Sequence, residues 1–318
     1  MVHAPISVFG FNRPLHLHKT LTALSRNLGA EKSELYIFID GPRSDEETRL
    51  TQASIDVASK FRTNFNSFNL IAQEQNLGLA KSVISGVSSV LEIHEKIIVV
   101  EDDLVTSRYF LDFINRGLEK YALNQEVASI HGYVTPLSNP AKEPFFLRGA
   151  DCWGWGTWRD RWEFFNENGQ DLISKIEQLQ LGNLLDLNGA YPFTQMLRDQ
   201  IVGKNDSWAI RWHASMFLEE KLTLFPSETY VENIGFDGSG THTGITNIYY
   251  SPLSEKRQEL PDEITLSESM TTELSKWYRE VYFGRRTKLN KVLIKPYLWV
   301  RNLLKRIVST GTMIISNK

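Results

Sequence analysis

Three consecutive carboxylates follow directly on an apolar run in this chain. The run is Ile97-Ile98-Val99-Val100, and Glu101, Asp102 and Asp103 come next. A buried strand that delivers three carboxylates to its carboxyl end is costly unless a cation or a hydrogen-bonding ligand is bound there. A helix N-cap would need only one of them. The triplet therefore predicts a metal-assisted site for a phosphorylated ligand.

Apolar runs and helix-like segments alternate through the first third of the chain. We expect buried strands over residues 6–11, 35–39, 70–72 and 96–100, and helices over 14–28, from 44 onward and over 79–91. Strands separated by helices imply right-handed crossovers and a parallel sheet. The carboxyl ends of these strands should therefore meet at one edge, where open α/β sheets bind ligands. Further along we expect a helix over 108–121 and strands over 128–130 and 145–147.

The predicted strands end in polar residues that could each bind one part of a nucleoside diphosphate. Besides the triplet, these residues are Arg13, Asp40, Asn76 and Lys81. Arg13 offers charge for phosphate and Asp40 offers an acceptor for the imide N–H of a base. Structural roles compete with these assignments, because Asp40 opens a turn-like Asp-Gly-Pro sequence. Lys81 lies at a predicted helix start, where capping and phosphate binding are both common.

The densest aromatic stretch of the chain spans residues 153–162. Trp153 and Trp155 flank Gly154 in a segment that we expect to be a loop. Flat apolar faces in a loop near a polar site suit the C–H face of a sugar ring. Trp158 and Trp162 share a helical face at their spacing, and we expect these two side chains to pack in the core.

Residues from about 6 to 242 resemble the inverting glycosyltransferases of the GT-A fold. The resemblance rests on the order Asn12-Arg13, Asp40-Gly41, Glu101-Asp102-Asp103, Gly154-Trp155, Asp206 with Trp208, and a late Gly-Ser-Gly-Thr-His run. The chain is similar to family two nucleotide-sugar glycosyltransferases and, more closely in motif order, to N-acetylglucosaminyltransferase I. This implies an α/β fold with a Rossmann-like, nucleotide-binding mixed sheet flanked by helices.

In that family the triplet is a DxD-type motif that binds metal and donor. Carried over by position, the resemblance implies that Asp103 holds Mn2+ (or Mg2+), that Asp102 contacts the ribose, and that Glu101 assists. Arg13 and Asp40 match the positions that hold the diphosphate and uracil. The implied reaction moves a sugar from a UDP-sugar, such as UDP-GlcNAc or a related hexose donor, to a hydroxyl of a glycan acceptor.

The resemblance also implies a catalytic base just before a tryptophan, which takes the proton of the acceptor hydroxyl. Asp206 stands there, in Asn-Asp-Ser-Trp, where the family has paired acids immediately before the tryptophan. Asp199 and Glu163 are alternative bases. Asp206 could instead cap a helix over 208–218.

Residues 235–244 contain too many glycines for a regular element, and we expect a mobile loop there. In related enzymes such a loop orders over the bound donor and excludes water. His242 would then reach the diphosphate or the metal, or else remain a solvated loop histidine.

The composition of the 318 residues, 42% hydrophobic and 23% charged, is that of an ordinary globular protein. Cys152 is the only cysteine, which excludes a disulfide framework and suits a reducing compartment. The sequence opens without a signal-peptide pattern and lacks the roughly 18 apolar residues of a spanning helix. We therefore expect a cytoplasmic protein.

We expect a catalytic domain over residues 1–250, with a nucleotide-binding part to about 125 and an acceptor part from about 126. Residues 251–318 are expected to be a linker and a basic amphipathic extension. Residues 279–318 hold ten Lys and Arg against one acid, so the rest of the chain is acidic. This asymmetry favours an anionic surface over nucleic acid. The segment 288–308 could lie on the cytoplasmic face of a membrane and reach a lipid-linked glycan, or pack on the body or a partner.

Two other classes of protein share some of these features. A nucleotidyltransferase also combines a parallel sheet with acidic metal ligands, but it commonly carries a glycine-rich basic loop after the first strand, which residues 10–14 match poorly. A non-catalytic carbohydrate-binding protein would keep the tryptophans without needing a metal. Fold alone does not separate these classes.

Overall fold

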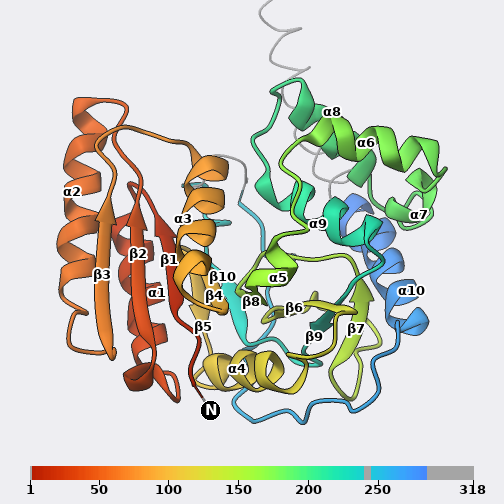
Figure 1. Ribbon diagram of the computed structural model, residues 1–318, viewed down its shortest axis with the longest axis horizontal. Helices are drawn as coiled ribbons and strands as arrows, with labels where there is room; N and C mark the ends of the chain where they lie inside the picture. Colours follow the sequence, from red (N-terminus) through yellow and green to blue (C-terminus); the bar gives the residue numbers. More distant parts are fainter. Residues whose placement is uncertain (1, 240–244, 285–318) are drawn as a thin grey trace, which may run out of the picture.

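A computed structural model describes residues 2–239 and 245–284 of the chain. Its centre is an eight-stranded mixed sheet flanked by helices on both faces (Figure 1). The strands lie in the order β3 (Ser67–Ala72), β2 (Glu34–Ile39), β1 (Ile6–Gly10), β4 (Lys96–Glu101), β8 (Trp155–Trp158), β6 (Val127–His131), β9 (Leu222–Phe225) and β7 (Phe145–Arg148). A separate antiparallel pair joins β5 (Leu104–Thr106) to β10 (Val231–Asn233).

The predicted parallel half of the sheet is confirmed. Strands β3, β2, β1 and β4 pair in parallel, and helices connect them as the alternation of the sequence predicts. Strand β8 then runs antiparallel to β4, which makes the sheet mixed. The helices are α1 (Pro14–Ser25), η1 (Ala30–Lys32), α2 (Asp45–Ser59), α3 (Leu79–Ile93), α4 (Phe110–Lys120), α5 (Arg159–Trp162), α6 (Gly169–Gln178), α7 (Gly182–Leu185), α8 (Phe193–Ile201), α9 (Trp208–Leu218), α10 (Glu268–Trp277) and η2 (Tyr278–Phe283).

The four central residues of β4 are apolar because both faces of the sheet are covered at this position. Ile98 and Val100 belong to a core cluster with residues of α1, α2 and α4, whereas Ile97 and Val99 belong to a cluster with residues of α3 and α9. Successive side chains of a strand point to opposite faces, so one short run anchors both layers. Burial of residues 97–100 on both faces of the sheet fixes the position of the strand, and with it the position of Glu101 at its carboxyl end.

The tryptophans of residues 153–162 are mainly core residues, which corrects two expectations. Trp155 lies in β8 rather than in a loop, and its side chain is 0% exposed. Its ring stacks on Trp208 at 5.6 Å and lies 5.5 Å from Trp212. Trp158 and Trp162 are buried as expected, but Trp158 belongs to β8 and does not share a helix with Trp162. Trp155 therefore joins the sheet to α9 and cannot stack on a sugar.

The segment after residue 250, expected to be a linker, packs on the body where the structure describes it. The buried Gln258 side chain accepts hydrogen bonds from the Ser227 N–H and hydroxyl at 2.8 and 2.9 Å and donates to the Glu228 carbonyl at 2.7 Å. Residues 285–318, which include the expected membrane-surface segment 288–308, lie outside the described residues. Within the described residues, no helix combines the length and apolar character needed to cross a bilayer.

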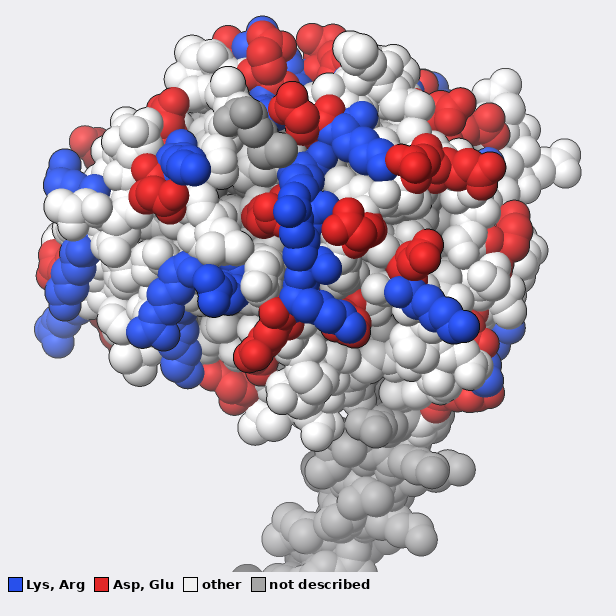
Figure 2. Space-filling model, turned by 90° about the horizontal axis from the view of Figure 1, so that it is seen from below, with Lys and Arg blue, Asp and Glu red and all other residues white. Residues whose placement is uncertain are grey.

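Several charged side chains on the lower face of the molecule form ion pairs. Basic and acidic side chains are interspersed over this face (Figure 2). On α4, Arg116 pairs with Asp112 at 2.8 Å and Lys120 with Asp262 at 2.6 Å, and Arg257 approaches Asp112 at 3.3 Å. Such pairing contrasts with the surplus of carboxylates at the end of β4.

Candidate active site

The edge formed by β1 and β4 brings Arg13 against the acidic triplet. The Arg13 Nε donates to Asp102 Oδ2 at 3.3 Å, and its Nη2 forms an ion pair with Asp102 Oδ1. The same Nη2 lies 3.0 Å from Asp103 Oδ2. Arg13 follows β1 and the triplet ends β4, so the parallel pairing of these strands places the three side chains at one edge. The predicted convergence at this edge is confirmed for these residues.

The electrostatics of this cluster are dominated by burial and by mutual repulsion of the carboxylates. Burial, helped by the neighbouring charges of Asp103 and Asp102, raises the pKa of Glu101 from 4.5 to about 8. Burial also raises the pKa of Asp102 to about 6, although the Arg13 guanidinium opposes this shift. Burial disfavours the charged form of Arg13, yet the attraction of Asp102 and Asp103 holds its pKa above the usual value. One guanidinium thus faces three carboxyl groups.

Asp103 faces the start of the glycine-rich segment. Its carbonyl accepts a hydrogen bond from the Ile234 N–H at 2.9 Å, and a Cβ atom placed on Gly235 would overlap its Oδ2. A glycine at 235 therefore lets the chain pass directly over the carboxylate. His242, expected to contact the diphosphate or the metal, lies outside the described residues.

The triplet offers oxygen ligands for a divalent cation, but not a closed cage. No group of three or more His, Cys, Asp or Glu side chains among the described residues is arranged to hold a metal ion. Hard cations such as Mg2+ are commonly held by one or two carboxylates together with substrate phosphates. Buried carboxylates in excess of their cationic partner fit this kind of site. The phosphates of a ligand would have to complete the coordination.

Asp40 and Asn76, both expected to contact the donor, bind each other and their own loops. The buried Asp40 carboxylate accepts hydrogen bonds from the N–H groups of Gly41, Leu77 and Gly78 and from the Asn76 amide, at 2.7 to 3.0 Å. A carboxylate has about four acceptor positions, so a base would have to share one of them. Asp40 thus ties the loop after β2 to the start of α3. Lys81 is exposed on the first turn of that helix.

Asp206 does not cap α9, which corrects the structural alternative for this residue. The Ser207 hydroxyl caps the helix by accepting the Ile210 N–H at 3.2 Å. The Asp206 side chain is 60% exposed and lies 3.9 Å from Arg211. Its Oδ2 is 3.4 Å from the point where a Cβ on Gly78 would stand. Asp206 is therefore beside the start of α3, at the same edge of the sheet as the loop held by Asp40.

The other two base candidates have different surroundings. Asp199 lies on α8, where it pairs with Lys204 at 3.2 Å and accepts from Gln195 at 2.9 Å. Glu163 is exposed directly after α5. Among the described residues, the contacts of Asp199 are thus with its own helix and the turn that follows it.

Trp153, one of the residues expected to bind a sugar, borders a cavity. Its ring contacts those of Tyr133 at 4.7 Å, Tyr249 at 5.2 Å and Phe236 at 5.6 Å. It lines a cavity of about 450 Å³. Gly154 has φ +69°, and a Cβ there would crowd Val231, so its role is to turn the chain into β8.

Asp151 is a candidate that the sequence analysis missed. It lines the same cavity, its side chain is 48% exposed, and its Oδ1 accepts the Cys152 N–H at 2.7 Å. Burial, together with the charges of Asp151, Glu101 and Asp103, raises the pKa of the Cys152 thiol. Cys152 thus lies near both Asp151 and the triplet. The signal in the sequence is a carboxylate just before the aromatic segment.

No protein-family model and no curated protein matches the sequence. Solved structures to which the chain is similar include S. aureus TarS 1–349, with 12% identity, a TM-score of 0.32 and coverage of 46% of this chain and 42% of that one. The glycosyltransferase GlyE of Streptococcus pneumoniae TIGR4 matches with 12% identity, a TM-score of 0.31 and coverage of 55% and 39%. Mannose-1-phosphate geranyltransferase of Thermus thermophilus matches with 10% identity, a TM-score of 0.38 and coverage of 73% and 76%.

The chain thus spans less than half the length of the TarS and GlyE chains that it matches. Because these identities and TM-scores are low, we take the function of the site from its own geometry.

We expect Asp40→Ala to destabilise the fold. It removes the acceptor of three buried or partly buried N–H groups and one side-chain amide, so the free energy of unfolding should fall by about 3 kcal/mol. Asp45→Ala is the matched control, because Asp45 is exposed on the first turn of α2 and contributes only about 0.5 kcal/mol through the helix dipole. Chemical denaturation measures both. Similar losses in the two variants would contradict the structural role of Asp40.

The stability of the metal-free protein should fall as the pH rises towards about 8. The pKa values of Glu101 and Asp102 in the fold, about 8 and about 6, exceed their ordinary values of 4.5 and 3.8. The folded state therefore binds more protons than the unfolded state above about pH 4, and this contribution is lost as the groups ionise. The slope per proton approaches about 1.4 kcal/mol per pH unit.

Urea unfolding in the presence of EDTA measures this dependence. Glu101→Gln should flatten the slope between about pH 6 and pH 8, whereas Glu126→Gln, at an exposed position, should leave it unchanged. An equal slope in wild type and Glu101→Gln would show that another group takes up the protons.

Proposed function

We propose that the protein is an inverting glycosyltransferase of the GT-A type that transfers a sugar from a UDP-sugar donor to a hydroxyl of a glycan acceptor. UDP-GlcNAc or a related hexose donor is the candidate donor. The observation that carries the proposal is the excess of carboxyl groups over cationic groups at the β1–β4 edge. Such an excess suits a divalent cation bound together with a diphosphate.

Different residues of this edge are proposed to bind different parts of the donor. Asp103 is the proposed metal ligand and Asp102 the proposed ribose contact; these two carboxylates supply the negative charge, and Glu101 assists. Arg13 balances part of this charge in the free protein and is placed to move towards a diphosphate when a cation takes over its role. A bound Mn2+ or Mg2+ would supply Lewis-acid stabilisation of the negative charge on the leaving diphosphate.

The loops around this cluster have a positioning role. Asp40 fixes the turn that leads into α3, and the amino end of a helix is a favourable place for phosphate. Lys81 on the first turn of α3 adds a positive charge there. Asn76 holds Asp40 in place, so both residues are proposed to shape the donor site even where they do not touch the donor.

Asp206 is the proposed general base. Inverting transfer needs a carboxylate that takes the proton of the acceptor hydroxyl as its oxygen attacks the anomeric carbon. The Asp206 side chain is exposed and lies beside the start of α3, at the edge where the donor is proposed to bind. Ser207 performs the capping of α9, which leaves Asp206 available for this role.

We expect UDP and Mn2+ to bind cooperatively. Because the protein offers few carboxylate ligands, the cation needs phosphate oxygens, and Mn2+ should raise the affinity for UDP at least about 10-fold. Asp103→Asn should abolish this gain, whereas Asp199→Asn on α8 should retain it. Isothermal titration with Mn2+ or EDTA measures the effect. UDP binding that ignores Mn2+ would contradict the proposal, and sugar binding without nucleotide would favour a carbohydrate-binding protein.

We expect Asp206→Asn to abolish turnover while keeping UDP affinity within about twofold. Loss of a general base typically costs about 100-fold to 10,000-fold in rate, whereas the amide keeps the shape of the side chain. Release of UDP from a panel of UDP-sugars, with GDP- and dTDP-sugars as controls, measures turnover. Asp151→Asn and Asp199→Asn are assayed beside it. Full activity of Asp206→Asn with loss in one of these would move the base to that residue.

A further inference from the structure

A largely apolar cavity of about 450 Å³ lies in the second half of the molecule. Side chains from α7, α8, α9 and β9 form much of its wall, among them Leu185, Phe193, Met196, Ile210, Phe217 and Phe225. Small-molecule sites are typically concave and apolar with a few placed polar groups, and this volume lies within their usual range. The cavity therefore has the size and character of a ligand site.

Polar side chains also line this cavity, and several of them already have partners within the protein. The Thr271 hydroxyl donates to the Ser267 carbonyl at 2.9 Å, and Arg148 forms an ion pair with Glu220 at 3.6 Å. The His213 Nδ1 atom lies 2.8 Å from the Ala150 carbonyl oxygen, and the His213 ring stacks on that of Phe193 with 4.6 Å between the ring centres. The Asp151 carboxylate accepts the Cys152 N–H at 2.7 Å through Oδ1 only, and its side chain is 48% exposed. Asp151 thus offers a hydrogen-bond acceptor to a ligand whose other end lies in the apolar part.

The chemistry of the wall selects an apolar occupant. A sugar buried against hydrocarbon would leave hydroxyl groups without partners, at a cost of roughly 1–3 kcal/mol each. A hydrocarbon or aromatic group gains about 0.8 kcal/mol for each buried methylene. The inner cavity therefore favours the apolar part of a ligand, and the Asp151 end favours its hydroxylated part.

The cavity lies beside the proposed donor site. Cys152 and Trp153 line it together with Asp151. Cys152 is near enough to both Asp151 and Glu101 for their charges to help raise the pKa of its thiol. The Trp153 ring packs on Phe236 at 5.6 Å, next to Gly235, which covers Asp103. A ligand seated in the cavity with its hydroxyl end at Asp151 would thus present that end towards the triplet.

We propose that this cavity binds the apolar aglycone of the acceptor, so that the acceptor is an amphipathic glycoside with an alkyl or aryl group rather than a free sugar. The identification of the ligand as the acceptor rests on the proposed glycosyltransferase function. Its hydroxylated sugar lies at Asp151 and its hydrocarbon group contacts α8 and α9. The proposal concerns binding alone and adds no chemical step.

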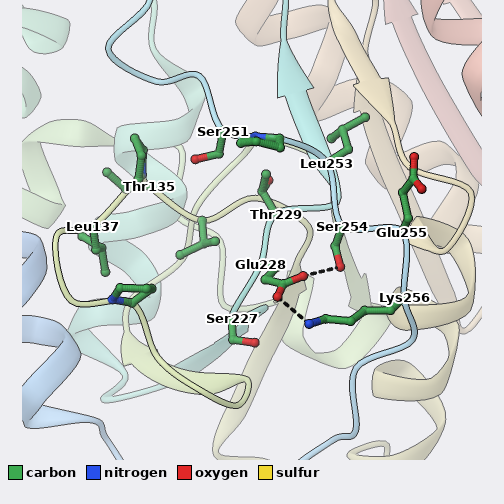
Figure 3. Close-up of a pocket in the computed structure, with 14 residues that line it drawn as sticks. Thr135, Leu137, Ser227, Glu228, Thr229, Ser251, Leu253, Ser254, Glu255 and Lys256 are labelled. Atoms are coloured by element: carbon green, nitrogen blue, oxygen red, sulfur yellow. Dashed lines mark hydrogen bonds and ion pairs between the residues drawn. The ribbon is translucent and has the colours of Figure 1, made fainter.

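A second depression of about 570 Å³ is less suited to this role (Figure 3). Its most prominent polar group, Glu228, already forms an ion pair with Lys256 at 2.6 Å and accepts from Ser254 at 2.8 Å. The pKa of Glu228 is lowered chiefly by its hydrogen bond with Lys256. The Glu228 carboxylate is thus already paired within the protein.

Octyl β-glucoside, methyl β-glucoside and glucose form a matched set of probes. Isothermal titration, with the detergent below its micelle concentration, should show octyl glucoside binding at least about 100-fold more tightly than methyl glucoside, because several methylenes become buried. Equal affinities for the two glycosides would overturn the proposal.

Two variants locate the binding. Ala209→Phe on α9 fills part of the cavity and should weaken octyl glucoside binding at least about 10-fold. Leu184→Glu is the milder second variant, because Leu184 lines the cavity but is 45% exposed, so the fold should tolerate it. Leu123→Glu is the control: Leu123 is 98% exposed and does not line the cavity. The assignment would be overturned if both cavity variants kept their affinity for octyl glucoside, or if only the Leu123→Glu control lost it.

Titration of UDP with Mn2+ on the same samples separates this inference from the proposed function. Selective octyl glucoside binding without metal-dependent UDP binding would leave the apolar site standing and overturn the transferase function. Metal-dependent UDP binding with no preference for octyl glucoside would keep the transferase and overturn the apolar acceptor site.

Discussion

The contact of Arg13 with Asp102 and Asp103 is the constraint on which the rest of the site depends. It forms because β1 and β4 are parallel neighbours, so the residues that follow them emerge at one edge. One guanidinium does not neutralise three carboxyl groups. The raised pKa values of Glu101 and Asp102 result first from burial and then from the repulsion between neighbouring carboxyl groups. A site arranged only for stability would use fewer charges, because buried ion pairs are often weaker than apolar packing. The excess of carboxyl groups over cationic groups is instead suited to binding a ligand.

The parallel half of the fold could be predicted from the sequence because its signals are local. Apolar runs of strand length alternate with amphipathic segments, and the handedness of crossovers then fixes how the ends of β1 and β4 meet. The second half is different. Trp155 reads as a loop residue because glycines flank it, yet its partners Trp208 and Trp212 lie about fifty residues further along the chain. Trp155 becomes a buried strand residue because its segment pairs antiparallel with β4 and is covered by α9. These are tertiary contacts, and they override local propensity.

The candidate site divides in the same way. The rule that strand ends converge was enough to bring Arg13 to the triplet, since it depends only on topology. Residue type did not reveal that the Asp40 carboxylate would be occupied by the N–H groups of its own loops. The same holds for Ser207, whose hydroxyl takes the capping position that Asp206 could have filled. Hydrogen bonds within a few residues compete with ligands for polar side chains, and only coordinates show which partner prevails.

The two halves of the central sheet also differ in chemistry. The four parallel strands end at one edge of the sheet, so the loops that follow them bring charged side chains and backbone N–H groups together there. Beyond β8 the strands are mixed in direction. Helix α9 packs on β6 and β8, and α6 to α8 pack aromatic and aliphatic side chains against α9. A charged ligand is therefore matched to the first half and an apolar group to the second. Residues 151–153 lie where these regions meet, which is why one short segment can contact the surroundings of both.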